Sequence, residues 1–193
     1  MTTPDHAVES YRAFVALALS HAVGDSLQLY VAQLRQQSSL HHLRWIPEKN
    51  WHLTLAFLGD QPQATLHTLW QDLISKLQDV SALSADIVAI SAFPDAKSSI
   101  LAALLDPTEP LRSLRAHVAA VCTKNGIALD ERDFKPHITL ARAGRGQRVN
   151  YPDECLHLSA TWNSVKLYTS QLTPSGSVYT PLRTLALPLS DSP

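Results

Sequence analysis

The sequence predicts an α+β domain whose sheet is mixed or antiparallel. β-like runs interleave with three amphipathic helical patterns, and two pairs of these runs are joined by short turns, as in hairpins. A hexapeptide within one β-like run also recurs, nearly unchanged, 85 residues further along the chain. A doubly wound parallel sheet would lack the hairpins, and the repeat indicates two lobes with matching strands.

The first half of the chain is typical of the order strand, helix, strand, helix. Residues 12–19 alternate and then run apolar, as a buried strand does, and residues 51–58 are β-like up to the turn signal at Gly59-Asp60. Helices are expected over residues 25–37 and about 63–77. Their apolar stripes consist of Leu27, Val31 and Leu34 in the first helix and Leu66, Leu69, Leu73 and Leu77 in the second.

Two strands and a third helix follow. Residues 85–92 and 99–105 are typical of strands joined across Phe93-Pro94-Asp95. The proline-flanked segment 107–110 then predicts the start of a helix, because proline is tolerated in a first helical turn. Asn125-Gly126 is the expected cap at the end of that helix.

The last part of the chain is predicted to be β structure. A short β-like run over residues 137–142 precedes a polar loop, 144–153. Two long alternating segments follow, 156–173 and 177–187, and the turn residues 174–176 between them predict a hairpin.

The composition is that of an ordinary globular protein: the 193 residues are 45% hydrophobic and 17% charged. No linker divides the chain, so a single bilobal domain is expected over residues 1–193, with loose tails at about 1–9 and 190–193. The formal net charge of −1 provides no basic field for long nucleic acid, so any nucleic acid must be held locally.

Cysteine usage and the N-terminal segment predict a cytoplasmic location. Cys122 and Cys155 form neither a disulfide framework nor a zinc-ligand spacing, which fits a reducing compartment. Asp5 and Glu9 stand where a secretory signal would be basic, and the apolar run 14–19 is far shorter than the roughly 20 residues of a membrane span. The short apolar run predicts no membrane partner. None of the six glycines falls into a Walker A or dinucleotide fingerprint, and we expect no cofactor.

The repeated hexapeptides carry the strongest functional signal. In an extended strand His52 shares a face with Thr54, and His137 shares one with Thr139. The opposite face is expected to be core, formed by Leu53, Leu55, Phe57, Ile138 and Leu140. One His-x-Thr match means little, and His157-Leu158-Ser159 is an expected decoy of that kind, but two such matches in β-like runs have a chance expectation on the order of 10⁻⁴.

Two histidines and two threonines that converge on one cleft suit phosphodiester cleavage. A neutral imidazole can deprotonate water or a hydroxyl while a protonated one supplies a proton to the leaving alkoxide. Mutual repulsion favours a singly protonated pair. The threonine hydroxyls can donate to phosphate oxygens, and the scheme requires no metal.

These residues are part of a wider resemblance that covers nearly the whole chain. The sequence resembles the two-histidine phosphoesterases, and within them the RNA 2′,3′-cyclic phosphodiesterases formerly described as 2′-5′ RNA ligases. The matching segments are Arg12-Ala13-Phe14-Val15-Ala16, residues 50–59 with the first motif, residues 134–142 with the second, and the closing segments 167–170 and 176–182.

The resemblance implies a bilobal fold, with two pseudo-symmetric sheet-plus-helix lobes around a central cleft. It also implies metal-independent hydrolysis of RNA 2′,3′-cyclic phosphates to 2′-phosphomonoesters. His52 would protonate the leaving 3′ oxygen, His137 would act as the base on water, and Thr54 and Thr139 would hold the phosphate. RNA ends or nucleotides with a 2′,3′-cyclic phosphate would be the partners. Separately from the resemblance, we expect no obligate protein partner and a monomer.

The resemblance also implies a phosphate- or substrate-contacting role for Arg142. Strict alternation from His137 places Arg142 on the wrong face, so the strand must end or bulge near Ala141 if Arg142 is to reach the cleft. The segment 97–102 departs from the family, because many relatives have an arginine before this strand and a tryptophan within it.

Three alternatives remain open at this point. One is a phosphodiesterase or reversible ligase for 2′-5′ linked oligonucleotides, another is an enzyme for a different cyclic nucleotide phosphate, and the third is a non-catalytic module that binds RNA ends. Lys135, Arg145 and Arg148 near the second motif form either a basic rim for RNA or solvated loop charges.

Overall fold

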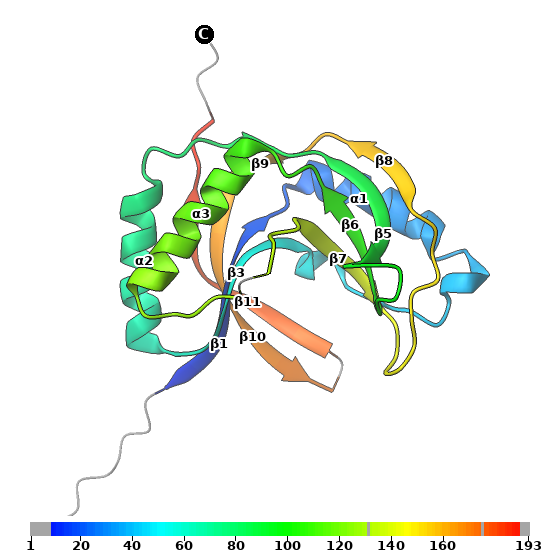
Figure 1. Cartoon of the computed structure of the whole chain (residues 1–193), viewed down its shortest axis with the longest axis horizontal. Coiled ribbons are helices and arrows are strands. Elements are labelled where there is room, and N and C mark those ends of the chain that lie inside the picture. The colour runs from blue at the N-terminus through cyan, green and yellow to red at the C-terminus, as the bar shows by residue number, and fades with distance from the viewer. Residues whose placement is uncertain (1–8, 131, 175, 190–193) are drawn as a thin grey trace, which may run out of the picture.

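The computed structural model describes residues 9–130, 132–174 and 176–189, so nearly all of the two tails expected at the chain ends lies outside the described residues. The molecule consists of two sheet-plus-helix lobes, as Figure 1 shows. The expected α+β class is therefore confirmed. The extent of the single domain over residues 1–193 stays a prediction.

The first lobe is a four-stranded antiparallel sheet with the strand order β11-β10-β1-β3. Helices α2 and α3 contact β3 and each other at the side of this sheet (Figure 1). The elements are β1 (Ser10–Ala18), β3 (His52–Pro62), α2 (Gln63–Leu77), α3 (Glu109–Lys124), β10 (Ser164–Thr173) and β11 (Gly176–Ala186).

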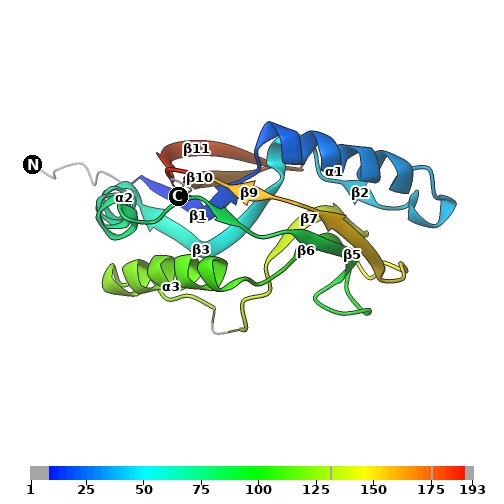
Figure 2. The ribbon, with the colours of Figure 1, turned by 90° about the horizontal axis from the view of Figure 1, so that it is seen from above.

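The second lobe is a five-stranded antiparallel sheet with the order β2-β7-β6-β5-β8, and α1 runs along it in Figure 2. Strands β4 and β9 form a separate two-stranded pair. The elements are α1 (His21–Leu34), β2 (Arg44–Trp45), β4 (Leu83–Ser84), β5 (Ile87–Phe93), β6 (Ile100–Leu105), β7 (His137–Arg142), β8 (Glu154–Leu158) and β9 (Thr161–Trp162), with 3₁₀ turns at Ser38–Leu40 and Glu48–Asn50.

The three predicted helices are present, and the apolar stripes predicted for the first two are buried. Helix α2 has the predicted limits, whereas α1 spans His21–Leu34 instead of 25–37. It starts early because the Ser20 side chain accepts a hydrogen bond from the backbone of Val23 and caps the helix there. The predicted single strand over residues 156–173 is wrong. The chain there leaves one sheet for another at Ala160, whose backbone N–H binds Asp86 instead of a neighbouring strand, and so forms β8, β9 and β10.

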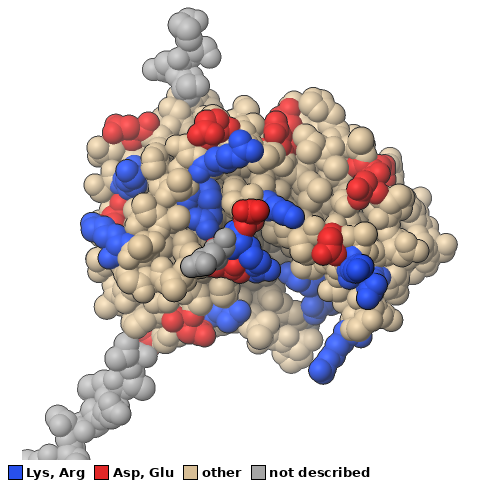
Figure 3. Space-filling view, viewed as in Figure 1, with Lys and Arg blue, Asp and Glu red and all other residues tan. Residues whose placement is uncertain are grey.

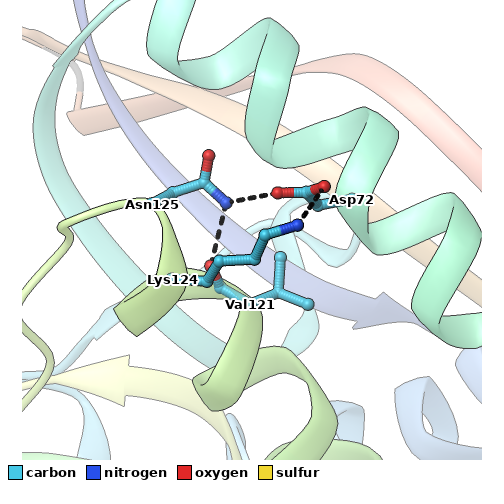
Figure 4. Close-up of polar contacts among 4 residues, drawn as sticks. All are labelled: Asp72, Val121, Lys124 and Asn125. Carbon is cyan, nitrogen blue, oxygen red and sulfur yellow. Dashed lines mark hydrogen bonds and ion pairs between the residues drawn. The ribbon is translucent and has the colours of Figure 1, made fainter.

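Helices α2 and α3 are linked through the carboxylate of Asp72 (Figure 4). One oxygen accepts from Lys124 Nζ at 2.8 Å, and the other accepts from Asn125 Nδ2 at 2.9 Å. The Asn125 amide also donates to the backbone oxygen of Val121, and Gly126 follows with a φ of 72°. The predicted Asn-Gly cap is therefore confirmed, and it also fixes the end of α3 against α2.

The turn predicted at Gly59-Asp60 is wrong, because β3 continues through it to Pro62. Ala13 of β1 pairs with Gly59, but Phe14 pairs with Phe57, so Leu58 is an extra residue and the strand contains a β-bulge. Gly59 has a φ of 70°, a conformation that glycine adopts without steric cost. Gly59 therefore belongs to the bulge and not to a turn.

We predict that Gly59→Ala lowers the free energy of unfolding by about 1–2 kcal/mol, because an L-residue with a side chain is strained at this φ. No atom lies within 4 Å of the position that the new Cβ would occupy, so the cost comes from the backbone and not from a clash. Gly59→Asn should cost less, since asparagine tolerates the left-handed region. Urea denaturation measures the free energy of unfolding of the wild type and the two variants. Equal values for Gly59→Ala and wild type would contradict the strain argument.

Candidate active site

A cavity of about 440 Å³ lies between the two lobes, and both predicted motifs line it. Strand β3 contributes His52 and Thr54, and β7 contributes His137, Thr139 and Arg142. The two strands contact each other, although they belong to different sheets. The structure thus brings all five predicted site residues to one cavity. Their chemical roles stay predictions.

Both motif strands carry a bulge at the same position, directly after the threonine. On β3, Thr54 pairs with Ala16 and Ala56 with Val15, which leaves Leu55 as the extra residue. On β7, Thr139 pairs with Ala102 and Ala141 with Leu101, which leaves Leu140 as the extra residue. A bulge reverses the alternation of side chains beyond it, so the next outward residue faces the cavity.

This pair of bulges decides where Arg142 and Phe57 point. Arg142 reaches the cavity, and of the two conditions expected for this, a strand end or a bulge near Ala141, the structure has the bulge. Phe57 occupies the equivalent position five residues after His52, and its expected place in the core is wrong. Its side chain is 46% exposed and lines the cavity, because the bulge at Leu55 turns it outward.

The two imidazoles are held in the same way. His52 Nδ1 lies 2.8 Å from the backbone oxygen of Asn50, and His137 Nδ1 lies 2.9 Å from the backbone oxygen of Lys135. A carbonyl oxygen only accepts hydrogen bonds, so each Nδ1 carries the proton and donates it. The proton-exchanging nitrogen of each neutral ring is therefore Nε2.

The cavity disfavours the charged form of both rings. The pKa of His52 is lowered to about 4, chiefly by burial and also by the charges of His137 and Arg142, against the opposing effect of the Asn50 hydrogen bond. The pKa of His137 is also lowered, first by burial and then by Arg142, while its bond to Lys135 acts in the opposite direction. Without an anion nearby, both imidazoles are neutral at pH 7.

Aromatic rings account for much of this burial. The His52 ring lies 4.7 Å from the Phe14 ring and 5.2 Å from the Tyr179 ring, measured between centroids. The His137 ring stacks on Phe93 at 3.8 Å. Each imidazole therefore has an aromatic neighbour that limits its rotation and its contact with water.

Several cavity residues were missed by sequence reasoning, because no motif singles them out. They are Arg12, Phe14, Arg44, Asn50, Ser177 and Tyr179. The Asn50 side chain donates to the backbone oxygen of Ser177 at 2.9 Å and so joins the segment before His52 to the β10–β11 hairpin. All of them except Arg44 lie in segments that carry the family resemblance, which was the signal that could have found them.

Of the three basic residues near the second motif, only Lys135 lies at a cavity. It lines a second cavity of about 1090 Å³, which shares Thr54, Phe57 and His137 with the central cavity. Ile100, in the segment that departs from the family, also lines this second cavity. Arg145 and Arg148 are exposed and line neither cavity.

The decoy motif lies elsewhere: His157 is exposed on β8, and its ring nitrogen is 3.8 Å from Asp86. Within residues 9–130, 132–174 and 176–189, no group of three or more His, Cys, Asp or Glu side chains is placed to hold a metal ion. In the same part of the chain, no helix combines the length and apolar character that a membrane crossing requires.

Comparisons with known proteins agree with this arrangement. Residues 23–173 match the family model of the 2′-5′ RNA ligase superfamily. An RNA 2′,3′-cyclic phosphodiesterase of Geobacillus stearothermophilus is 28% identical over 76% of this chain, which spans only 46% of the length of that relative. One from Thermotoga maritima is 24% identical over 87% of this chain and 91% of its own length.

Solved structures show the same fold. The TT0787 protein of Thermus thermophilus superposes with a TM-score of 0.78 and 26% identity, over 93% of this chain and 99% of that one. Escherichia coli LigT superposes with a TM-score of 0.75 and 23% identity over the same shares of the two chains. The expected bilobal two-histidine phosphoesterase fold is therefore confirmed.

We predict that Arg142→Gln raises the pKa of both His52 and His137, because the guanidinium charge disfavours a second positive charge in the cavity. NMR titration of the imidazole resonances measures the change, with Arg145→Gln as the control for an exposed loop arginine. Unchanged pKa values in Arg142→Gln would show that its guanidinium does not act on the imidazoles.

Proposed function

The chain belongs to the 2′-5′ RNA ligase superfamily, and from this premise we propose that it hydrolyses RNA 2′,3′-cyclic phosphates to 2′-phosphomonoesters without a metal ion. The observation that carries the proposal is the pair of imidazoles in one cavity, each with Nδ1–H bound to a backbone carbonyl and Nε2 left for proton exchange. The activity named for the matched relatives supports the same assignment.

His137 acts as the base in this reaction and His52 as the acid. Nε2 of neutral His137 removes a proton from water as its oxygen bonds to phosphorus, and the bond from phosphorus to the 3′ oxygen breaks. Protonated His52 gives its Nε2 proton to that 3′ oxygen. The products are a 3′-hydroxyl and a 2′-phosphate, and the pair of histidines has passed one proton across the cavity.

Thr54, Thr139 and Arg142 hold the phosphate. The two hydroxyls donate hydrogen bonds to the non-bridging oxygens, and the guanidinium balances the charge that accumulates on them in the transition state. These contacts also orient the phosphorus between the two imidazoles, so that attack and departure occur on opposite sides.

The substrate itself supplies the condition under which His52 is protonated. In the free cavity the low pKa of His52 leaves it neutral at pH 7. A bound phosphodiester brings a negative charge beside the ring, which favours the imidazolium. Because burial makes this imidazolium a stronger acid than an exposed one, it releases its proton readily to the leaving oxygen.

Incubation with uridine 2′,3′-cyclic phosphate in the presence of a chelator tests the proposal, and we expect uridine 2′-phosphate as the product. His52→Ala and His137→Ala should each lower kcat by a factor on the order of 10² to 10⁴ with the fold retained, because each removes a proton-transfer group. His157→Ala, which removes the exposed decoy histidine, is the matched control. Binding without turnover by the wild-type protein would identify a binding module, and full activity of either cavity variant would remove that histidine from the mechanism.

We further predict that kcat/KM reaches its maximum below pH 6.5. The pH dependence of kcat/KM reports the protonation states of the protein without substrate. In that state the singly protonated pair of histidines is most abundant between their two pKa values, which are both lowered from 6.5. The maximum of kcat should lie at higher pH, since the bound phosphate favours protonation. Rates measured across pH 4–8 give both profiles, and a kcat/KM maximum above pH 7 would contradict the lowered values.

A further inference from the structure

The central cavity carries more positive charge than one phosphodiester requires. Its described lining residues include Arg12, Arg44 and Arg142 and no Asp or Glu, in a chain whose formal net charge is −1. Acidic and basic side chains are interspersed on the face shown in Figure 3. Of the two cavities described, the central one has basic lining residues without acidic ones.

These arginines are not explained by stability. Arg44 and Arg142 lie directly opposite each other in the β2–β7 ladder, where two like charges are unfavourable. Among the described residues, none of the three forms an ion pair with a carboxylate. Asp60 is opposite Arg12 in the β1–β3 ladder, but the Arg12 guanidinium instead lies over the Phe57 ring, 4.6 Å from its centroid.

Arg142 differs from the other two arginines in its relation to the imidazoles. It follows the His137 motif on β7, and its charge lowers the pKa of both His52 and His137. Arg142 is thus placed to serve the cyclic phosphate. Arg12 on β1 and Arg44 on β2 line the same cavity from other strands, where they would meet a second anionic group of a larger ligand.

We propose that Arg12 and Arg44 form a second anion subsite, which binds the phosphate on the 5′ side of the terminal nucleotide of a single-stranded RNA. The subsite rests on the proposed function and narrows it, because it makes the substrate an oligonucleotide end or a 5′-phosphorylated nucleotide. Arginine suits this task, since its planar guanidinium binds phosphate oxygens in pairs and stacks on aromatic rings such as Phe57.

The second cavity is a poorer site for this phosphate. Its basic residues Arg115, Arg132 and Lys135 are offset by Asp95, Asp130 and Asp133, and Arg132 is already paired with Asp130. Balanced charge gives little attraction for an anion. The charge distribution therefore directs the RNA backbone into the arginine-lined cavity.

Three substrates distinguish recognition of the second phosphate from recognition of a second nucleoside. They are uridine 2′,3′-cyclic phosphate, the same compound with a 5′-phosphate, and the uridylyl-uridine dinucleotide with a 2′,3′-cyclic phosphate end. We expect kcat/KM about tenfold higher for both substrates that carry the second phosphate, the usual size of a charge-assisted contact. Arg12→Gln and Arg44→Gln should each reduce the ratio of kcat/KM with the second phosphate to kcat/KM without it severalfold. Arg145→Gln, an exposed arginine away from both cavities, should keep the wild-type ratio.

A binding measurement keeps the test independent of turnover. Calorimetry with uridine 2′-phosphate and uridine 2′,5′-bisphosphate should show about tenfold tighter binding of the bisphosphate to wild type and a smaller difference for the Arg12→Gln and Arg44→Gln variants. Tighter binding of the bisphosphate without turnover of any cyclic phosphate would support the subsite and refute the proposed hydrolysis.

The opposite combination is also informative. Suppose that all three substrates are turned over with equal kcat/KM, and that uridine 2′-phosphate and uridine 2′,5′-bisphosphate bind with equal affinity. This result would overturn the subsite and support the proposed hydrolysis. A gain seen for the dinucleotide but not for the 5′-phosphorylated mononucleotide would overturn it as well, because the second nucleoside would then be the group recognised.

Discussion

The arrangement of the site depends on two hydrogen bonds, from His52 Nδ1 to the backbone oxygen of Asn50 and from His137 Nδ1 to that of Lys135. Each bond joins a histidine to the residue two positions before it, so the strand that presents the ring also fixes its tautomer. A backbone acceptor cannot titrate, so each ring has the same tautomer whenever it is neutral. Everything that the cavity can do with protons follows from the two Nε2 atoms.

Burial of these rings sets up a conflict that only an anion resolves. Burial among aromatic rings and the Arg142 charge lower the pKa of both imidazoles, which suits the base of the proposed reaction but leaves its acid without a proton. A phosphate bound between them reverses the balance, because its charge replaces the solvation that burial removed. The same low dielectric that disfavours charge in the free cavity strengthens each contact with the phosphate. The site is thus matched to an anion and not to a neutral ligand.

The sequence was sufficient for the local features and for the pairing of the motifs. Periodicity located α2 and β7, and the repeat of His-x-Thr brought His52 and His137 into one hypothesis before their distance in space was known. Period-two reasoning failed where the backbone departs from a regular strand. It places Phe57 in the core, because a bulge changes the facing of a side chain without changing composition. The turn expected at Gly59-Asp60 fails for a related reason, since the glycine that indicates a turn also suits a bulge. The sequence offers no way to predict that Arg44 lines the cavity, since β2 has only two residues and no pattern of its own.

The two halves of the site are copies up to the bulge and differ directly after it. Burial alternates identically along His52–Phe57 and His137–Arg142, yet the residue that each bulge turns into the cavity is an aromatic ring on one strand and a guanidinium on the other. A symmetric cavity would treat the two bridging oxygens of a cyclic phosphate alike. Arg142 follows the motif of His137, whereas Phe57 follows the motif of His52 and lies under the Arg12 guanidinium, so the two imidazoles have different neighbours. The residue directly after each repeated hexapeptide therefore supplies the asymmetry that the proposed acid and base roles require.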